Sequence, residues 1–205
     1  MYTAMFSGMF LGASMIIPLG VQNSYVLSQG IKREHHFTIA TICMLCDILL
    51  ISLGIFGGGK LITSSNTLML IIGWGGFIFL VAYACLAFRS FWINDYQQEK
   101  RNFKSSSKKK VIVTTLALTL LNPHVYLDTV MILGSVGGAF QGQEKLAFAI
   151  GTFLASIIWF YSLAGGAAKL APWLDKPTVR RWIDLFIGIV MLVIASFLLQ
   201  STLVK

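Results

Sequence analysis

Two carboxylates lie inside stretches of this chain that are otherwise free of charge and long enough to cross a bilayer. Between Phe37 and Gly59 the only charged residue is Asp47, and between Val111 and Gln143 it is Asp128. An acid at the centre of a membrane helix costs about 2.5–3.5 kcal/mol on insertion scales, so such residues usually face a protein interior and a partner. Because these stretches hold no base, the expected partner is a cation that binds and leaves. The two acids therefore predict transport of a cation.

The composition supports a membrane protein. Hydrophobic residues make up 56% of the chain and charged residues 12%, whereas soluble domains carry roughly 25% charged residues. A chain of 205 residues has room for about six spans of ~20 residues, and backbone groups in hydrocarbon must be paired within the helix. We therefore expect an all-α membrane protein with six transmembrane helices. The expected spans are Ala4–Leu27, Phe37–Gly58, Leu68–Phe88, Val111–Leu133, Leu146–Ala168 and Leu185–Val204.

The distribution of basic residues predicts the topology. The connections after the first, third and fifth spans carry two, seven and four Lys or Arg residues, whereas the opposite face has only Lys60, Lys145 and Lys205. The positive-inside rule places the first set in the cytoplasm and both termini outside, unless the first span is only partly inserted. Because the basic residues lie between apolar spans, we expect them to contact anionic lipids and not nucleic acid.

A basic linker divides the chain into halves with three spans each. We expect one transmembrane domain over residues 1–205, with a first repeat at 1–92, a cytoplasmic linker at 93–110 and a second repeat at 111–205. An odd number of spans in each half makes the second half insert upside down relative to the first. The sequence thus predicts a 3+3 inverted repeat, which is common among transporters.

A proline interrupts the first and fourth predicted spans at matching places. Pro18 is followed five residues later by Asn23, and Pro123 is followed five residues later by Asp128. Proline removes a backbone donor and clashes with the preceding turn, so each proline is expected to break or kink its helix. Interrupted helices at corresponding positions of two halves indicate a transport site, although membrane helices also tolerate proline for packing alone.

Asp47 and Asp128 can bind a guanidinium or ammonium group, carry protons, or both. A low dielectric favours the neutral acid and a bound cation favours the carboxylate, so a substrate and a proton can compete for one group, as an antiporter requires. The alternative is that both acids only hold helices together through hydrogen bonds. From its distance to the helix end, Asp47 is expected to be the more deeply buried of the two.

The residues around the breaks offer further contacts. Free backbone donors at the start of a half-helix favour anions, so a substrate carboxylate is expected there, with amide side chains assisting. His124 could relay protons or form an interhelical contact, and nearby aromatic rings could stack on a cation or pack in the core. These candidates are Gln22, Asn23, Asn122 and His124 among the polar residues and Tyr126, Trp74 and Trp159 among the aromatic ones.

Two other classes of protein remain as alternatives. Cys43 and Cys46 form a C-x-x-C pair that could serve a membrane thiol-redox enzyme, but they lie on one helix with no thioredoxin-like flanks. A divalent-cation exporter is a second alternative, although two separated acids without a Met, His or Cys cluster make a poor metal site. We therefore expect a transporter and not an enzyme, without a cofactor or a bound metal.

Several motifs resemble those of the lysine and arginine exporter (LysE/ArgO) family, and the resemblance runs nearly from end to end. The fourth-span motif is the most specific of them, and the first-span motif departs from the family pattern at Val21, where proline is usual. The matching stretches are Pro18–Asn23, Gln29–Ile31, Cys46–Ile51, Gly54–Gly58, Leu121–Thr129 and Gly134–Gly138.

The resemblance implies an exporter of basic amino acids in the bacterial inner membrane, chiefly for L-arginine and also for lysine or canavanine. Asp47 and Asp128 are then the family's expected acidic residues. Moving one positive charge out of a cell costs about 2.3 kcal/mol per 100 mV, so inward movement of protons in exchange would offset this work. Exchange of one or of two protons per substrate is compatible with two acids.

Overall fold

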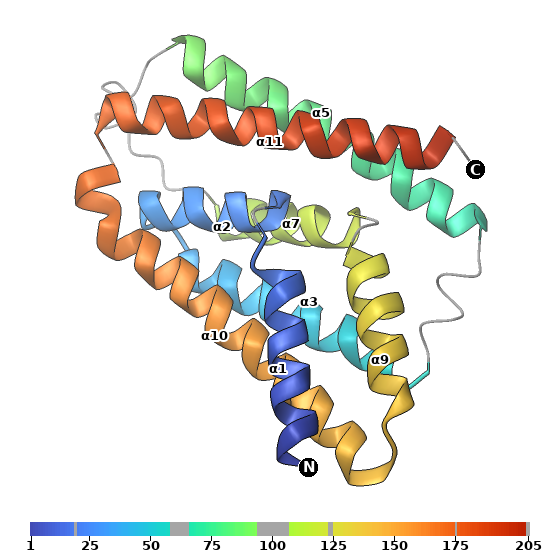
Figure 1. The fold of residues 1–205 in the computed structure, drawn as a ribbon. Helices are drawn as coiled ribbons and strands as arrows, with labels where there is room; N and C mark the ends of the chain where they lie inside the picture. The colour runs from blue at the N-terminus through green and yellow to red at the C-terminus, as the bar shows by residue number, and fades with distance from the viewer. Residues whose placement is uncertain (19, 58–65, 94–106, 123–124, 175, 204–205) are drawn as a thin grey trace.

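The computed structural model describes the chain except residues 19, 58–65, 94–106, 123–124, 175 and 204–205. The described part is helical throughout and contains no strand (Figure 1). Its elements are α1 (Tyr2–Ile16), α2 (Val21–Lys32), α3 (His36–Ile55), α5 (Asn66–Ile93), α7 (Lys108–Leu120), the π-helix η1 (Tyr126–Leu133), α9 (Gly134–Ala139), α10 (Gly142–Leu174) and α11 (Pro177–Leu203).

The first predicted span is a bent pair of helices. Helix α1 ends at Ile16, α2 begins at Val21, and their axes differ by 79°. The interruption coincides with Pro18, whose nitrogen carries no hydrogen and so cannot donate a helical hydrogen bond to a carbonyl of the preceding turn. Helix α2 then continues to Lys32, beyond the predicted end of the span at Leu27.

The fourth predicted span is also interrupted. Helix α7 ends at Leu120, and the chain becomes helical again in η1 and α9. Pro123 and His124, on which the predicted break depends, lie outside the described residues. The π-helical segment carries Asp128, and π-helical turns are frequent at functional sites.

Two helices in the described part of the chain, α3 and α10, are by themselves long and apolar enough to cross a membrane. The bent pair α1–α2 makes a third candidate. The described part of the chain is therefore all-helical and contains two or three segments long and apolar enough to span a membrane, whereas the full set of six spans stays a prediction.

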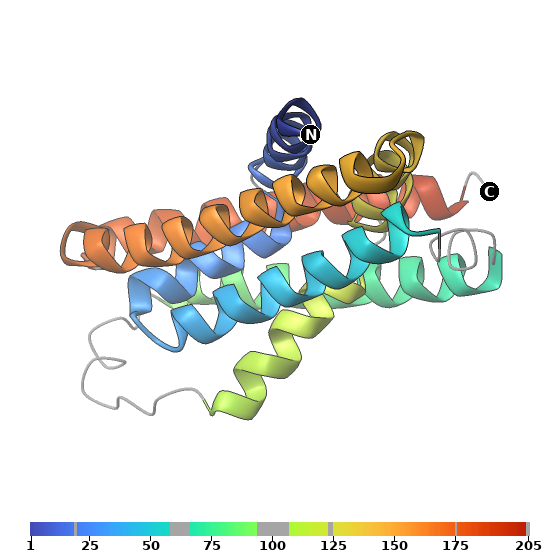
Figure 2. The same ribbon diagram turned by 90° about the horizontal axis from the view of Figure 1, so that it is seen from below.

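The helices pack in a crossed arrangement (Figures 1 and 2). Helices α1 and α2 lie against α10, while α7, η1 and α9 lie against α3. Helices α3 and α10 contact each other, and α5 and α11 form a separate pair that covers α2 and α7. The largest apolar core lies where these groups meet and includes Val26, Ile39, Phe160 and Met191, which are almost completely buried.

Glycines allow the helices to approach closely at two crossings. Where α1 crosses α10, a Cβ atom added to Gly151 would overlap the main-chain oxygen of Met5. Where α3 crosses the second interrupted span, a Cβ atom on Gly54 would lie 2.8 Å from the Thr129 oxygen, and one on Gly134 would lie 2.8 Å from the Gly54 oxygen. Small residues at such crossings are typical of membrane helices, whose backbones can then touch.

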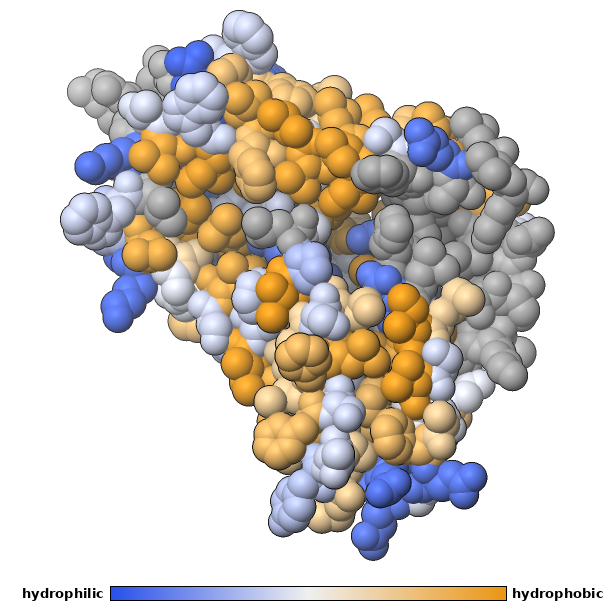
Figure 3. All heavy atoms as spheres, viewed as in Figure 1, coloured by the Kyte–Doolittle hydropathy of each residue, from blue (hydrophilic) through white to orange (hydrophobic). Residues whose placement is uncertain are grey.

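Basic residues gather at one end of the molecule, which we call the basic end. It consists of the C-terminal ends of α2, α5 and α10 and the N-terminal ends of α7 and α11, on the left in Figure 1. Hydrophilic residues lie at the margins of the surface in Figure 3, and apolar ones cover the area between them. The described basic residues of this end are Lys32, Arg33, Arg89, Lys108, Lys109, Lys110, Lys169, Lys176 and Arg181.

Candidate functional site

Both interrupted spans line one cavity of about 280 Å³. The end of α1 and the start of α2 form one wall, and Asn122 with the start of η1 forms another. Asp47 of α3, Phe160 of α10 and Ile194 of α11 complete it. This volume is close to the lower bound of the roughly 300–1,000 Å³ typical of pockets for drug-sized ligands, so the cavity suits a ligand as small as an amino acid.

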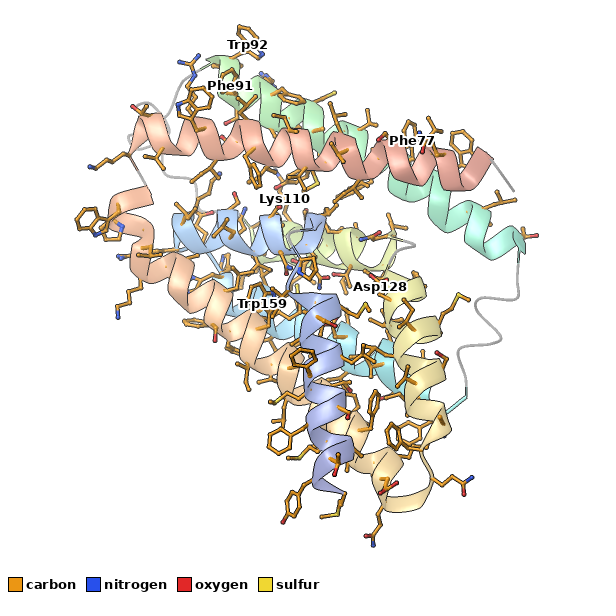
Figure 4. All side chains as sticks on the ribbon, in the orientation of Figure 1. Phe77, Phe91, Trp92, Lys110, Asp128 and Trp159 are labelled. Carbon is orange, nitrogen blue, oxygen red and sulfur yellow. The ribbon has the colours of Figure 1, made fainter. Side chains whose placement is uncertain are left out.

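The cavity brings together most of the polar residues selected from the sequence. Asp47, Asp128, Gln22, Asn23 and Asn122 all line it, and so does Pro18. Figure 3 shows hydrophilic residues in a hollow in the middle of an otherwise apolar face, in the region where Figure 4 places Asp128. These residues thus lie together around one cavity, while their role in binding stays a prediction.

The two carboxylates differ in burial. The Asp47 side chain is 3% exposed, and its Oδ2 accepts a hydrogen bond of 2.9 Å from the Ser156 hydroxyl of α10. Asp128 is only partly buried, so the predicted order of burial is confirmed. Ser156 is completely buried and was not selected from the sequence, because a single serine in an apolar helix is a common feature.

Asn23 holds the first interruption together. Its Nδ2 donates to the carbonyl oxygens of Ile16 at 2.7 Å and of Pro18 at 2.8 Å, and its Oδ1 accepts from Trp159 Nε1 at 3.2 Å. Ile16 is the last residue of α1, so its carbonyl has no partner within the helix. Non-helical backbone at membrane depth is tolerated only where such groups are satisfied. The amide of Asn23 therefore builds the cavity wall by replacing the missing helical donors.

Tyr126 satisfies the backbone at the second interruption as Asn23 does at the first. Its hydroxyl donates to the carbonyl of Leu120 at 2.8 Å, and Leu120 is the last residue of α7. In both spans, a side chain from the helix after the break thus satisfies the final carbonyl of the helix before it.

Replacing Asn23 with leucine should destabilise the protein by about 1–3 kcal/mol, because the carbonyls of Ile16 and Pro18 would lose the donor that pairs them at the break. Thermal unfolding of the purified protein in detergent measures this effect. Trp159→Phe is the matched control, since it removes a single hydrogen bond from the same amide and should cost less. An unchanged unfolding temperature for Asn23→Leu would contradict this role of the amide.

The structure does not bring the predicted aromatic contacts to the cavity. Trp74 is 42% exposed on α5 and meets the Phe77 ring edge-on at 6.0 Å, while Trp159 and Tyr126 donate the hydrogen bonds described above. The ring that lines the cavity is Phe160, which is 1% exposed. Adjacent positions on a helix point about 100° apart, and the sequence alone could not separate Trp159 from its neighbour.

The described lining contains two carboxylates and no lysine, arginine or histidine. It also contains the first residues of α2, whose capping residue Gly20 has no side chain with which to pair the helix's free backbone donors. Gln22 adds a buried Nε2 that has no hydrogen-bond partner among the described residues. The cavity therefore offers acceptors for a cation and donors for an anion.

A metal site and a thiol site are not supported in the described part of the chain. No three His, Cys, Asp or Glu side chains there lie close enough together to bind a metal ion. Cys43 and Cys46 are free thiols, and Cys46 is partly exposed, but Cys43 is completely buried, whereas a reactive pair needs both thiols to be accessible.

Comparison with known proteins identifies the family of this chain. The family model described as LysE type translocator matches residues 13–202. A putative amino-acid transporter, YggA, of Aeromonas salmonicida is 45% identical over 203 residues, which cover 99% of this chain and 98% of that protein. The arginine exporter protein ArgO of Pectobacterium carotovorum is 44% identical over 191 residues, with 93% and 94% covered. ArgO of Yersinia enterocolitica is 44% identical over 203 residues, with 99% of both chains covered.

No solved structure matches the chain. The family match over most of the length and the relatives at 44–45% identity nevertheless lead to one conclusion. The chain belongs to the LysE family of translocators.

Proposed function

We propose that this protein exports basic amino acids, chiefly L-arginine and also lysine or canavanine, across the bacterial inner membrane in exchange for protons. The observation that carries the proposal is the cavity in which Asp47 and Asp128 lie together with the start of α2. Relatives that are 44% identical over 93% and 99% of this chain bear the name arginine exporter, and membership of a translocator family argues for a transporter over an enzyme.

The charges of the cavity suit a zwitterion that carries an extra positive group. The N-terminus of α2 has a positive partial charge and free N–H groups, which favour the carboxylate of an amino acid. The two acids then face its amino group and its cationic side chain. A guanidinium group is planar and carries five donors, so it can bind a carboxylate through two parallel hydrogen bonds. An amino acid without a cationic side chain offers a positive group to only one of the two carboxylates.

Coupling to protons follows from the same acids. A buried carboxylate that must lose its proton before it binds a cation links the two movements, and the outward charge is then compensated. Exchange of one proton per arginine cancels the electrical work, and exchange of two also uses the membrane potential. Both ratios are compatible with two acids.

We also propose that the chain forms six spans as a 3+3 inverted repeat. The contacts between helices support this, because they keep their pattern when the two halves are exchanged. Helices α1 and α2 of the first half pack on α10 of the second, just as α7, η1 and α9 of the second half pack on α3 of the first. The contacts α3–α10 and α5–α11 each join corresponding helices of the two halves, so exchanging the halves leaves them unchanged. Each half thus places its interrupted span on the second helix of the other half, and the shared cavity lies between them.

In this topology the basic end faces the cytoplasm and contacts anionic lipids. A cysteine introduced by Ser106→Cys, in a linker outside the described residues, should resist an impermeant thiol reagent added to intact spheroplasts. It should react once they are opened, because seven basic residues between Arg89 and Lys110 oppose translocation. Labelling from outside would invert the topology.

Transport into inside-out vesicles tests the function. Labelled L-arginine should accumulate when the vesicle interior is acidic, because outward-moving protons then drive the reaction that corresponds to export. Lysine and canavanine should compete, whereas citrulline, which lacks the cationic group, and Mn²⁺ should not. Competition by Mn²⁺ would favour a divalent-cation exporter, and the absence of arginine uptake under every gradient would refute the proposal.

A further inference from the structure

Helix α2 carries an unusual set of polar side chains. Gln22, Ser24, Tyr25, Ser28 and Gln29 lie on this helix, and all except Gln22 are at least nine-tenths buried. We call these five residues the polar seam. Gln22, Tyr25 and Gln29 share one face of the helix through their i, i+3 and i+7 spacing, and Ser24 and Ser28 share a neighbouring face.

Three polar atoms of the seam have no hydrogen-bond partner among the described residues. They are Gln22 Nε2, Ser24 Oγ and Gln29 Oε1, although the last two belong to side chains that are only 1% and 8% exposed. Buried polar atoms in native proteins are nearly always paired, and leaving one unpaired costs about 1–3 kcal/mol. Three such atoms on one helix indicate that another conformation of the protein satisfies them.

The polar seam connects the cavity with the basic end. Gln22 lines the cavity, and α2 ends at Lys32, ten residues later. Ten helical residues span about 15 Å, which is half of the ~30 Å hydrocarbon thickness of a bilayer. The seam thus runs from the middle of the proposed membrane layer to its cytoplasmic surface.

The elements that face the seam are polar as well. Thr119 of α7 and Cys43 of α3 are both completely buried, and Gln22 and Thr119 lie against the Cys43 thiol. Tyr25 lies against Thr114 of α7. In this structure α2 contacts α3 and α7, and Tyr25, Cys43 and Thr119 are buried between these helices.

We infer that the polar seam is the cytoplasmic half of the substrate pathway, which this structure shows closed. When α2 and α7 separate, the polar seam lines a water-filled passage through which a hydrated amino-acid cation reaches Asp47 and Asp128. Its amide and hydroxyl groups then bind water and the substrate, which explains why three of its polar atoms have no partner among the described residues in the closed state. This inference rests on the proposed export function, and it adds the route and the two helices that open it.

Cys43 is a native reporter for this movement. The variant Cys46→Ser/Cys85→Ser retains Cys43 as its only thiol, and in inside-out vesicles the cytoplasmic side faces the medium. An impermeant methanethiosulfonate reagent should label Cys43 slowly at rest and much faster during arginine uptake. Minor conformations are populated at about 0.1–10%, so a shift towards the open state should raise the labelling rate about tenfold or more. In intact spheroplasts, the same reagent should not reach Cys43.

The control variant Cys43→Ser/Cys46→Ser retains only Cys85, which is exposed on the outer surface of α5. That position faces lipid, so its labelling should stay low with and without arginine. Uptake is measured in the same vesicles. If arginine enters but Cys43 never reacts, or reacts only from the periplasmic side in intact spheroplasts, the pathway is wrong while the export function stands. If no arginine enters the wild-type vesicles, the export function itself fails.

Gln29→Met separates a pathway role from a structural one. Methionine has a similar shape and removes the unpaired acceptor, so the unfolding temperature should stay the same or rise. The rate of arginine uptake should fall about tenfold, since an apolar side chain then lines the passage and about 1.4 kcal/mol of barrier corresponds to a factor of ten. Ile31→Leu, a volume-conserving change in the same helix, should alter neither quantity. Wild-type uptake by Gln29→Met would overturn the inference.

Discussion

Asp47→Asn and Asp128→Asn should each abolish export of basic amino acids while the protein remains in the membrane. Asparagine has nearly the same shape but no charge, so the cationic group of the substrate would lie in the cavity without its counter-ion. Removing one partner of a buried ion pair costs about 3–5 kcal/mol, which corresponds to roughly a 10²–10⁴-fold loss of affinity. Protection of cells from canavanine measures the effect, and membrane abundance is determined by immunoblotting.

Asp184→Asn is the matched control for both variants. Asp184 lies on α11, where it accepts a hydrogen bond of 2.7 Å from Ser90, and it does not line the cavity. The same chemical change at this position should leave export close to that of the wild type. If Asp47→Asn or Asp128→Asn protected cells as well as the wild type does, that carboxylate would not belong to the transport site.

Gly151→Val should prevent stable folding. The α1–α10 crossing brings the Met5 main-chain oxygen so close to Gly151 that no side chain fits, and backbone cannot rotate away as a flexible side chain can. Overpacking a well-packed interior costs typically about 1–3 kcal/mol, and separating two helix backbones should lie at the upper end. The measurement is the yield and unfolding temperature of the purified protein in detergent.

Gly166→Val tests whether the effect comes from this crossing. Gly166 lies on the same helix, and a Cβ atom there would meet nothing within 4 Å. This variant should purify and unfold as the wild type does. Equal losses for Gly151→Val and Gly166→Val would show that any glycine of α10 is needed, and the close crossing would not explain the result.

The sequence predicted the helical class, which the structure confirms, and a break at Pro18, which stays a prediction although α1 ends at Ile16 and α2 begins at Val21; both inferences rest on local properties. Charge-free runs of about 20 residues require helices in hydrocarbon, and proline removes the donor at a fixed position. It did not predict that α2 continues to Lys32 or that η1 is π-helical. Those features depend on packing against α10 and α3, which no local pattern contains.

In the candidate site, too, the sequence predicted what depends on local properties and missed what depends on packing. Isolated carboxylates at membrane depth are costly wherever they occur, so Asp47 and Asp128 could be selected before any contact was known. The sequence also selected Asn23, but its amide turned out to bind the carbonyls of the break. Ser156 and Phe160 were missed, because their importance comes from the helix that they face.

Binding of labelled L-arginine to the purified protein tests the shared cavity most directly. One site per chain is expected, and Asp47→Asn, Asp128→Asn and the double variant should all lose binding to a similar extent, because the two acids hold one ligand and mutational effects within one site are not additive. Asp184→Asn should bind as the wild type does. Two independent sites, or wild-type affinity in either single variant, would contradict a single cavity formed by both halves of the chain.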